Sequence, residues 1–476
     1  MTALATHPWG MLHLGLGSFH RAHQAYYMHA LNASGDTRWR LAGGNIRPDM
    51  ADTLAALAAQ GGAYTLETIT PADVHSYTRI TSIREVIAFE PGLAGLVARA
   101  ADPATRIISF TVTEAGYYLD AHHQLDVQQP DIAADLAAAR GTTPMNPAGS
   151  TIYGALTAML RSRMQAQAGP VTLLNCDNLR HNGERVRAGL LGFIAQLNEP
   201  ELLAWVNAHT TCPNAMVDRI TPRPTPDVAA RVLAATGWAD AVPVMGESFI
   251  QWVIEDNFCA GRPAWEAVGV EMVESVAPYE EAKIRLLNAT HSCIAWAGTL
   301  VGYHYIHQGT LDPAIRRIAY DYATDDAIPV LNTPGKPSPV NLPAYRDVVL
   351  DRFGNPAIQD TNQRVAMDGY SKIPGFIAPT ISERLARSEP IASVAMLPAL
   401  FLAYLQRWHT GQIAYTYQDQ AMDPANAHAI CEAADPVTAF AADTVLWGAL
   451  ASDPRLVDAL RKAYERVTLF IRNHSA

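Results

Sequence analysis

The sequence predicts an α/β domain with a mostly parallel sheet over residues 1–277 and a mainly α-helical domain over residues 278–476. In the first part, short apolar runs rich in β-branched residues alternate with helical stretches, a pattern typical of βαβ units. In the second part, strand patterns become scarce and helical patterns follow one another. The 476 residues also exceed what one hydrophobic core supports, so we expect at least two domains.

The composition is that of an ordinary globular protein and argues against several classes of partner. Hydrophobic residues make up 49% of the chain, and the net charge of −11 disfavours nucleic acid or an anionic membrane. A small uncharged substrate fits better. The five cysteines are widely spread and form no CxxC pair, which indicates reduced thiols. The chain shows no signal-peptide pattern and no apolar run of the roughly 20 residues that a membrane span needs, so we expect a cytoplasmic protein.

Residues 9–35 have the pattern of a strand, a glycine turn and a helix. Gly15 and Gly17 follow the apolar run, and Ser18 and Phe19 begin the helix, with Ser18 placed to cap it. The amides of such a helix start can face a pyrophosphate. His20 stands where the third glycine of the dinucleotide-binding fingerprint is expected, so a plain glycine-rich turn remains the alternative. We predict that the two glycines, Ser18 and Phe19 bind a cofactor.

A second strand at 39–42 leads into an acidic turn that could bind the adenosine ribose. Asp49 is the candidate acceptor for the ribose hydroxyls, and Asn45 is a candidate helper. Arg47 could instead attract a 2′-phosphate, so NAD is preferred over NADP while both stay open. Helix capping is the alternative role of Asp49.

Two further strands, at 106–113 and 171–175, end in residues that could reach a ligand. In a parallel sheet, ligands bind at the carboxyl ends of the strands. Thr113 ends the first of these strands and Glu114 follows it, and both are predicted to contact the cofactor. Asn178 follows the second and could aim its amide into the cleft, with an Asx-turn as the alternative.

Helical patterns cover 151–167 and 182–197, and a polar pair follows them. Asp218 and Arg219 are neighbours in an otherwise apolar setting. A buried Asp218 would need a partner, which could be an arginine or a substrate hydroxyl.

The stretch at 278–296 concentrates residues suited to catalysis. It is predicted to be an unbroken helix, and at about 100° per residue four polar side chains fall on one arc of under half the circumference. These residues are Glu280, Lys283, Asn288 and His291. Because Ile284 and Leu287 share the arc, the face should be semi-buried, which lowers the proton affinity of a lysine and makes it a candidate base. With Asn288 as a donor to an anionic oxygen, the set suits the interconversion of an alcohol and a carbonyl.

Other chemistries find less support. The sequence has no G-x-S-x-G elbow and no complete P-loop. His20 and His23 have a spacing that zinc ligands can have, but no nearby cysteine or carboxylate completes a site, so we expect no metal.

Seven segments, in order, resemble the polyol-specific long-chain dehydrogenases, the family of mannitol dehydrogenase. They are GLGSFHRAHQAYY (15–27), FTVTEAGYY (110–118), LLNCDNLRHNGE (173–184), TCPNAMVDRITPRP (211–224), GESFIQWVIEDNF (246–258), EEAKIRLLNATHSCIAW (280–296) and IQDTNQRVAMDGYSKIP (358–374). The resemblance implies an N-terminal Rossmann-type domain, a mainly helical C-terminal domain, NAD as the cofactor and no metal.

The resemblance also implies roles for single residues. Lys283 would be the general base, Asn178 and Asn288 would hold the alkoxide-like oxygen, and Glu280 would gate proton exchange with solvent. Four residues would contact the polyol hydroxyls: Asp218, His291, Arg364 and Lys372. Arg364 and Lys372 rest on the resemblance alone. Ala115 departs from the Lys or Gly of many relatives, which leaves cofactor contacts at that loop open.

The activity that the resemblance implies is NAD-dependent oxidation of a sugar alcohol to a ketose. D-arabinitol, which would give D-xylulose, is the favoured substrate, and mannitol or a uronate such as fructuronate or tagaturonate is the alternative. A zinc-dependent alcohol dehydrogenase and a non-catalytic NAD sensor are the alternatives from other classes. We expect a monomer, with a homodimer as the second choice.

Overall fold

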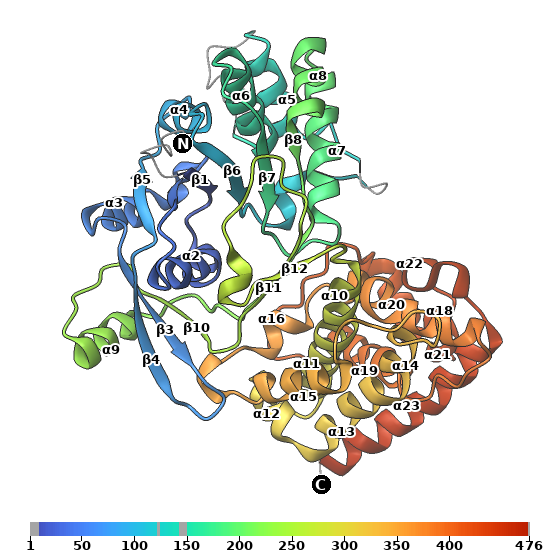
Figure 1. Cartoon of the computed structure of the whole chain (residues 1–476). Coiled ribbons are helices and arrows are strands. Elements are labelled where there is room, and N and C mark those ends of the chain that lie inside the picture. The colour runs from blue at the N-terminus through green and yellow to red at the C-terminus, as the bar shows by residue number, and fades with distance from the viewer. Residues whose placement is uncertain (1–8, 121–123, 142–149, 475–476) are drawn as a thin grey trace. The chain divides into compact units, whose positions relative to one another are not determined.

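The computed structural model describes residues 9–120, 124–141 and 150–474 (Figure 1). By its internal contacts the chain divides into two units. One consists of Met1–Thr70 and His75–Ala277, and the other of Pro71–Val74 and Pro278–Ala476. Each unit is described by itself.

The first unit is built on a six-stranded sheet in which all neighbouring strands are parallel. The strands are β1 Trp9–Leu14, β2 Trp39–Gly44, β5 Ile83–Ile87, β6 Thr105–Phe110, β7 Val171–Asn175 and β8 Thr210–Thr211. Their spatial order is β5-β2-β1-β6-β7-β8, so the direction of winding reverses between β1 and β6. This is the order of dinucleotide-binding doubly wound sheets, whose ligands lie at the reversal. The predicted parallel sheet is confirmed.

Side chains of the sheet alternate between two hydrophobic cores. Leu12, Ile108 and Leu173 belong to one core, whereas Met11 and Ile107, one position along their strands, belong to the other. A strand buried on both faces needs apolar residues at every position, which explains its continuous apolar run.

Helices cover both cores, and α6, α7 and α8 pack together beside β7 and β8 (Figure 1). The α-helices of this unit are α1 Ser18–Ala22, α2 Gln24–Ala33, α3 Ala51–Ala59, α4 Ala94–Ala100, α5 Pro130–Ala139, α6 Ile152–Gln165, α7 Asn182–Ala195, α8 Pro200–His209 and α9 Pro226–Thr236. Short 3₁₀ turns are η1 Pro48–Met50, η2 Glu114–Tyr117 and η3 Trp265–Val268.

Two smaller sheets complete the unit. In the first, β3 Tyr64–Ile69 lies between β10 Val244–Glu247 and β4 His75–Ile80. In the second, β11 Gln251–Glu255 lies between β12 Glu271–Val273 and β9 Ala215–Asp218.

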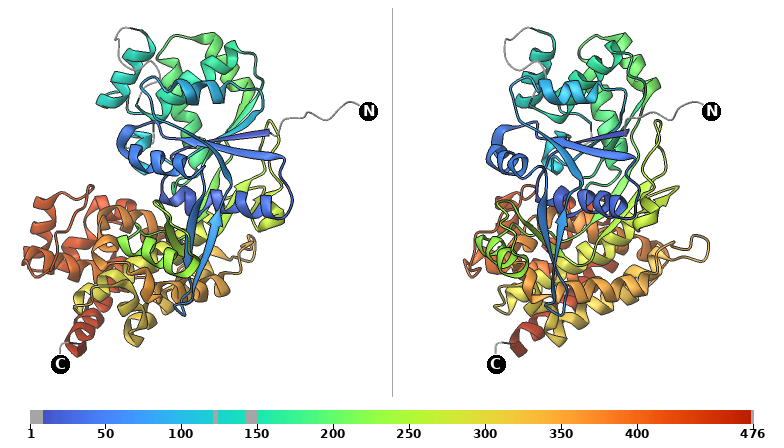
Figure 2. Two further views of the ribbon diagram at one scale, coloured as in Figure 1. Left: turned by 90° about the vertical axis from the view of Figure 1, so that its left-hand side faces the viewer. Right: turned by 60° about the vertical axis from the view of Figure 1, so that its left-hand side comes forward.

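The second unit is helical, and no strand occurs among its described residues from 278 to 474 (Figure 2). Its α-helices are α10 Ala277–Ala282, α11 Ala289–Leu300, α12 Ile306–Leu311, α13 Pro313–Asp321, α14 Ile328–Leu331, α15 Leu342–Phe353, α16 Asn362–Ala366, α17 Gly369–Lys372, α18 Ala378–Ala386, α19 Met396–His409, α20 Pro424–Glu432, α21 Pro436–Ala441, α22 Thr444–Trp447 and α23 Pro454–His474. The predicted helical character is confirmed. Among the described residues, no helix combines the length and the apolar character that crossing a bilayer requires.

Three stretches of this unit are π-helical: η4 Lys283–Asn288, η5 Tyr322–Ala327 and η7 Ile373–Ile377. η4 contacts both of the others. Since π-turns are rare and are frequent at functional sites, this cluster marks the surroundings of η4 as a candidate site.

Candidate active site

The turn after β1 requires glycine at its first position. Gly15 has φ +109°, and a Cβ there would lie 2.3 Å from the carbonyl oxygen of Thr111. Two of the hydrogen bonds that hold the turn reach the end of β2 and the residue after it: the Gly15 amide donates to the Gly44 carbonyl at 2.9 Å, and the Leu16 amide donates to Oδ1 of Asn45 at 2.8 Å. Asn45 therefore stabilises the turn, a role that the sequence did not suggest.

Gly17, and not Ser18, is the N-cap of the helix that follows. Its extended backbone (φ −72°, ψ 178°) makes the turn into α1, so the predicted cap at Ser18 is wrong. The helix is also shorter than predicted, because the backbone breaks at His23 (φ −121°, ψ −86°), whose Nε2 lies 2.9 Å from the Gln251 carbonyl oxygen. A Cβ on Gly17 would meet no atom within 4 Å. The space beside Gly17 is therefore open.

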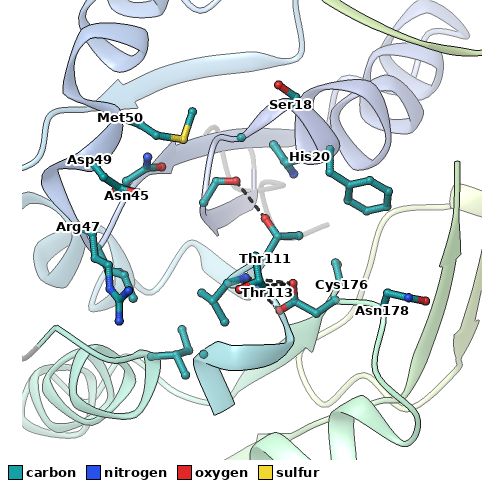
Figure 3. Close-up of a pocket in the computed structure, with 18 residues that line it drawn as sticks. Ser18, His20, Asn45, Arg47, Asp49, Met50, Thr111, Thr113, Cys176 and Asn178 are labelled. Carbon is teal, nitrogen blue, oxygen red and sulfur yellow. Dashed lines mark hydrogen bonds between the residues drawn. The ribbon is translucent and has the colours of Figure 1, made fainter. Parts of the chain in front are cut away.

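A cavity of about 490 Å³ lies at the carboxyl ends of β1, β2, β6 and β7 (Figure 3). The predicted cofactor and amide residues that line it are Gly15, Gly17, Ser18, Phe19, Asn45, Asp49, Thr113 and Asn178. In Figure 3, Asn45 and Asp49 lie on the side opposite Asn178. The side chain of Glu114 lies outside the part that the structure describes. The structure thus gathers residues from four strand ends around one cavity, where a doubly wound sheet binds its ligand.

Arg47 lines this cavity but is held by its neighbours. Its Nη2 donates to the Tyr118 hydroxyl at 2.8 Å and lies 3.7 Å from a carboxylate oxygen of Asp131, and its Nε donates to the Ser150 carbonyl at 3.1 Å. Asp49 is exposed in η1 beside it. The acidic group is therefore open to a ligand, whereas the guanidinium already has partners.

His20, which replaces the third glycine, is buried against His13. The two rings stack at 3.4 Å, and Nδ1 of His13 lies 2.8 Å from the Ser109 hydroxyl. Burial lowers the pKa of His13 to about 3, and burial together with the nearby His13 ring lowers the pKa of His20 well below its usual value. The pair is neutral near pH 7.

Asp177 is a residue of the cavity that sequence reasoning passed over. Its carboxylate accepts hydrogen bonds from the amides of Val112 and Thr113 and from the Tyr117 hydroxyl. Thr113 has φ 67° and ψ 160°, a region that is almost exclusive to glycine and costs another residue about 1–3 kcal/mol. The local signal was an acidic residue two positions after a buried strand.

Asp218 ends β9 and is buried, 5% exposed. Its neighbour Arg219 donates to the carbonyls of Glu247 (2.9 Å) and Ala22 (2.6 Å) and stacks over the Tyr26 ring. Arg219 is thus bound to backbone oxygens and an aromatic ring.

In the second unit, Lys283 is buried, 7% exposed, in η4, while Asn288 at the other end of η4 is half-buried. The predicted unbroken α-helix is therefore wrong here: the Ala289 amide donates to the Ile284 carbonyl, five residues back. A regular helix would set Lys283 and Asn288 about 140° apart. The wider π-turn brings residues five apart closer to one face, so the two candidates are nearer in angle than the regular count gave.

His291, Asp360 and Arg364 form a polar cluster in this unit. Nε2 of His291 lies 3.2 Å from Oδ2 of Asp360, and its ring stacks on Phe353. Arg364 donates to both carboxylate oxygens of Asp360, at 2.6 and 2.5 Å. Burial would raise the pKa of Asp360, but its contacts with His291 and Arg364 outweigh burial and hold the pKa below its usual range. Asp360 was missed, although its i,i+4 spacing to Arg364 was a visible signal.

Lys372 ends α17, directly before η7, and is half-buried. Its Nζ donates to the Val365 carbonyl at 2.5 Å. Burial lowers the pKa of Lys372 to about 8. Lys372 and His291 are thus two groups of this unit whose proton affinity is reduced by burial. Glu280 is buried one turn before Lys283.

The described residues hold no group of three or more histidine, cysteine or acidic side chains arranged to bind a metal ion. Of the two histidines weighed as a zinc pair, His23 lies against the Gln251 carbonyl and Gln24, and His20 stacks on His13.

Comparison with known proteins assigns both units. The model of the mannitol dehydrogenase Rossmann domain matches residues 9–267, and that of the mannitol dehydrogenase C-terminal domain matches residues 275–468. D-arabinitol 4-dehydrogenase of Ralstonia nicotianae is 60% identical over 96% of this chain and 96% of its own length. The enzyme of the same name from Klebsiella pneumoniae is 53% identical over 97% and 98%. The structure of Pseudomonas fluorescens mannitol 2-dehydrogenase with NAD and D-mannitol matches with a TM-score of 0.80 and 34% identity, over 98% of this chain and 94% of that one.

Proposed function

This chain belongs to the mannitol dehydrogenase family, and from that membership we propose that it catalyses the NAD-dependent oxidation of D-arabinitol to D-xylulose. The observation that carries the proposal is the similarity, 60% and 53% over nearly the full length, to two enzymes named D-arabinitol 4-dehydrogenase. We assign dinucleotide binding to a domain formed by residues 1–277 and substrate binding and catalysis to a helical domain formed by residues 278–476.

The cavity of the first unit supports NAD rather than NADP. Asp49 is exposed on its wall, where a carboxylate would accept hydrogen bonds from the ribose hydroxyls and repel a 2′-phosphate. Arg47, the group that could have attracted that phosphate, is bound to Tyr118 and Ser150 and lies near Asp131. The related mannitol 2-dehydrogenase was solved with NAD. When bound, NAD supplies the acceptor for the hydride.

In the proposed reaction, Lys283 acts as a neutral amine and takes the proton of the C4 hydroxyl. The C–H bond at that carbon then breaks, and its electron pair leaves with the hydride. Asn178 and Asn288 donate to the oxygen as it gains negative charge, and a donor of this kind is worth about 3–4 kcal/mol. Burial of Lys283 supports this role, because a desolvated amine binds its proton less tightly.

The remaining candidates bind the substrate or move the proton onward. Asp218, His291, Arg364 and Lys372 contact the polyol hydroxyls. Glu280, buried one turn from Lys283, exchanges the proton between Lys283 and solvent. No metal takes part in this scheme.

The test is the initial rate of NADH formation, followed at 340 nm, on a panel of substrates. D-arabinitol should give the highest kcat/KM, ahead of mannitol, and the uronates should be poor substrates in the reverse direction. Lys283→Met, which keeps the length and apolar body of the side chain, should lower kcat for oxidation by at least about 10²-fold because a general base contributes about 10²–10⁴. NADH binding should stay within a few-fold of the wild type. Oxidation by Lys283→Met at a rate near that of the wild type would refute the base assignment.

Metal independence has its own test. Dialysis against EDTA and 1,10-phenanthroline should leave kcat unchanged in this scheme. Loss of activity that returns with Zn²⁺ would favour a zinc-dependent alcohol dehydrogenase instead.

A further inference from the structure

Asp177 links two loops that form the cavity wall, and every polar group that it offers has a partner. Its Oδ1 accepts the Thr113 amide at 2.9 Å, and both carboxylate oxygens accept the Val112 amide, at 3.1 and 3.0 Å. The Tyr117 hydroxyl donates to Oδ2. The side chain thus reaches from the end of β7 across to the loop after β6, where it meets three donors.

The backbone of Asp177 is held just as firmly. Its amide donates to Oδ1 of Asn175 at 2.8 Å, and its carbonyl accepts from the Leu179 amide at 2.9 Å and from Nδ2 of Asn182 at 3.0 Å. Asn182, fully buried at the start of α7, is fixed in turn by the Ala215 strand. Asp177 is therefore anchored to the sheet, and the loop after β6 is anchored to Asp177.

The loop that Asp177 holds would not keep this shape unaided. Thr113 is β-branched and has φ 67° and ψ 160°, a backbone conformation that only glycine adopts without strain. Its amide hydrogen bond to Asp177 is charge-assisted, and such bonds are roughly twice as strong as neutral ones. Thr113 lines the cavity, as do Thr111, Val112 and Gly116 on either side of it.

The geometry points to Asp177 as a positioning residue: by holding Thr113 in a glycine-like conformation and fixing the turn that carries Asn178, it shapes the wall against which the dinucleotide binds. This inference rests on the proposed function, in which that cavity holds NAD. Asp177 precedes Asn178 on the 176–178 turn. The hydrogen bonds of Asp177 therefore also fix the backbone position from which the Asn178 side-chain amide extends.

Asp177→Asn tests the idea with the smallest change of shape. The asparagine side chain retains one acceptor oxygen but places an NH₂ group opposite at least one of the three donors. The loop after β6 therefore loses at least one of its hydrogen bonds to residue 177. We expect the dissociation constant for NADH, measured by fluorescence titration, to rise about tenfold, and kcat to fall by a similar factor. Without ligand, hydrogen–deuterium exchange over residues 110–118 should become faster.

Asp240→Asn is the matched control in the same unit. Asp240 is equally buried, 6% exposed, and likewise accepts two backbone amides, from Thr65 and Val242, and one side-chain donor, from Gln60. None of these residues lines the cavity. Its NADH affinity, and its exchange over 110–118, should stay within twofold of the wild type.

A second substitution separates positioning from general stability. Glycine accepts the Thr113 conformation without strain, so Thr113→Gly added to Asp177→Asn should recover at least threefold in NADH affinity. A purely structural role for Asp177 predicts no recovery, and that result would overturn the inference. Equal behaviour of Asp177→Asn and Asp240→Asn would overturn it as well.

Two further outcomes are covered. If Asp177→Asn cannot be purified in a folded form, Tyr117→Phe replaces it in the test, because this change removes one donor to Asp177 and keeps the buried ring. Tyr117→Phe should weaken NADH binding two- to fivefold. Unchanged NADH binding would count against the inference. If the wild type binds no NADH, the proposed function fails, while the exchange of residues 110–118 still decides whether Asp177 holds the loop.

Discussion

The two glycines of the turn after β1 differ in what the fold requires of them. A methyl group on Gly17 would meet no protein atom within 4 Å and would project into open space at the cavity wall. Gly15, two residues earlier, has φ +109° and backbone 2.3 Å from the site of a Cβ. The turn thus requires the first glycine of the motif, whereas we propose that the second leaves room for the pyrophosphate of a bound dinucleotide.

Gly17→Ala should therefore separate binding from stability. We expect NADH affinity to fall at least tenfold, while the free energy of unfolding in urea falls by no more than about 1 kcal/mol, the cost of alanine in place of glycine at an N-cap. Gly335→Ala, another glycine with open space around it but outside the cavity, should change neither quantity. Unaltered NADH binding by Gly17→Ala would mean that no ligand passes close to this position.

Lys372 gives a pH dependence that can be assigned to one group. Since burial lowers its pKa to about 8, its ammonium becomes an amine as the pH rises through 8. If the ammonium donates to a polyol hydroxyl, KM for the polyol should rise above pH 8. Lys372→Arg stays charged at these pH values, so its KM should show no rise there. A KM profile identical in both proteins would remove Lys372 from the substrate site.

At the scale of the element, the carbonyls of η4 are supported by side-chain hydroxyls. Tyr322 donates to the Arg285 carbonyl at 2.9 Å, Thr290 donates to those of Leu286 and Leu287, and Ser292 donates to that of Asn288 at 3.0 Å. In a π-turn the backbone amides are displaced from the carbonyls to which they donate in a regular helix. The three hydroxyl groups donate to carbonyls of this segment. We therefore expect these side chains to stabilise the π-helical form of the segment that carries Lys283.

Thr290→Val removes the hydroxyl whose single proton lies between the Leu286 and Leu287 carbonyls, with little change of shape. Because buried carbonyls lose a donor, the free energy of unfolding should fall by about 1–3 kcal/mol. Thr310→Val is the control: its hydroxyl donates to the Ile306 carbonyl in α12, a regular helix where the backbone already serves that oxygen, so the loss should be roughly 0.5 kcal/mol. Urea denaturation followed by circular dichroism measures both, and equal losses would show that η4 needs no special support.

Sequence patterns predicted most elements but not where a regular element changes its form. The strand at 171–175 was predicted to the residue, and the helix at 182–197 ended two residues early. The unbroken helix predicted over 278–296 is instead α10, the π-helical η4 and α11 in succession. Periodicity locates apolar faces, whereas a break or a π-turn depends on contacts with distant residues.

At the scale of the whole molecule, binding of the dinucleotide should increase the thermal stability of the protein. A ligand that binds only the native state adds about 2.7 kcal/mol at 100 times its dissociation constant. NADH should therefore raise the melting temperature of the full chain in a concentration-dependent way. NADPH at the same concentration should raise it less, because in the proposed function the Asp49 carboxylate would repel a 2′-phosphate. A larger shift with NADPH would reverse the cofactor assignment.

The sequence by itself determined the two-part architecture, the parallel sheet, the glycine turn and the family, because these follow from local periodicity, local backbone preference and ordered motifs. The tertiary structure alone decided which partners meet. Asp177 and Val112 are 65 residues apart, and Arg47 and Tyr118 are 71 apart, yet strand register and loop packing join each pair. The physical reason is that a hydrogen bond acts over about 3 Å in space, and no pattern of neighbouring residues specifies which distant donor will arrive there.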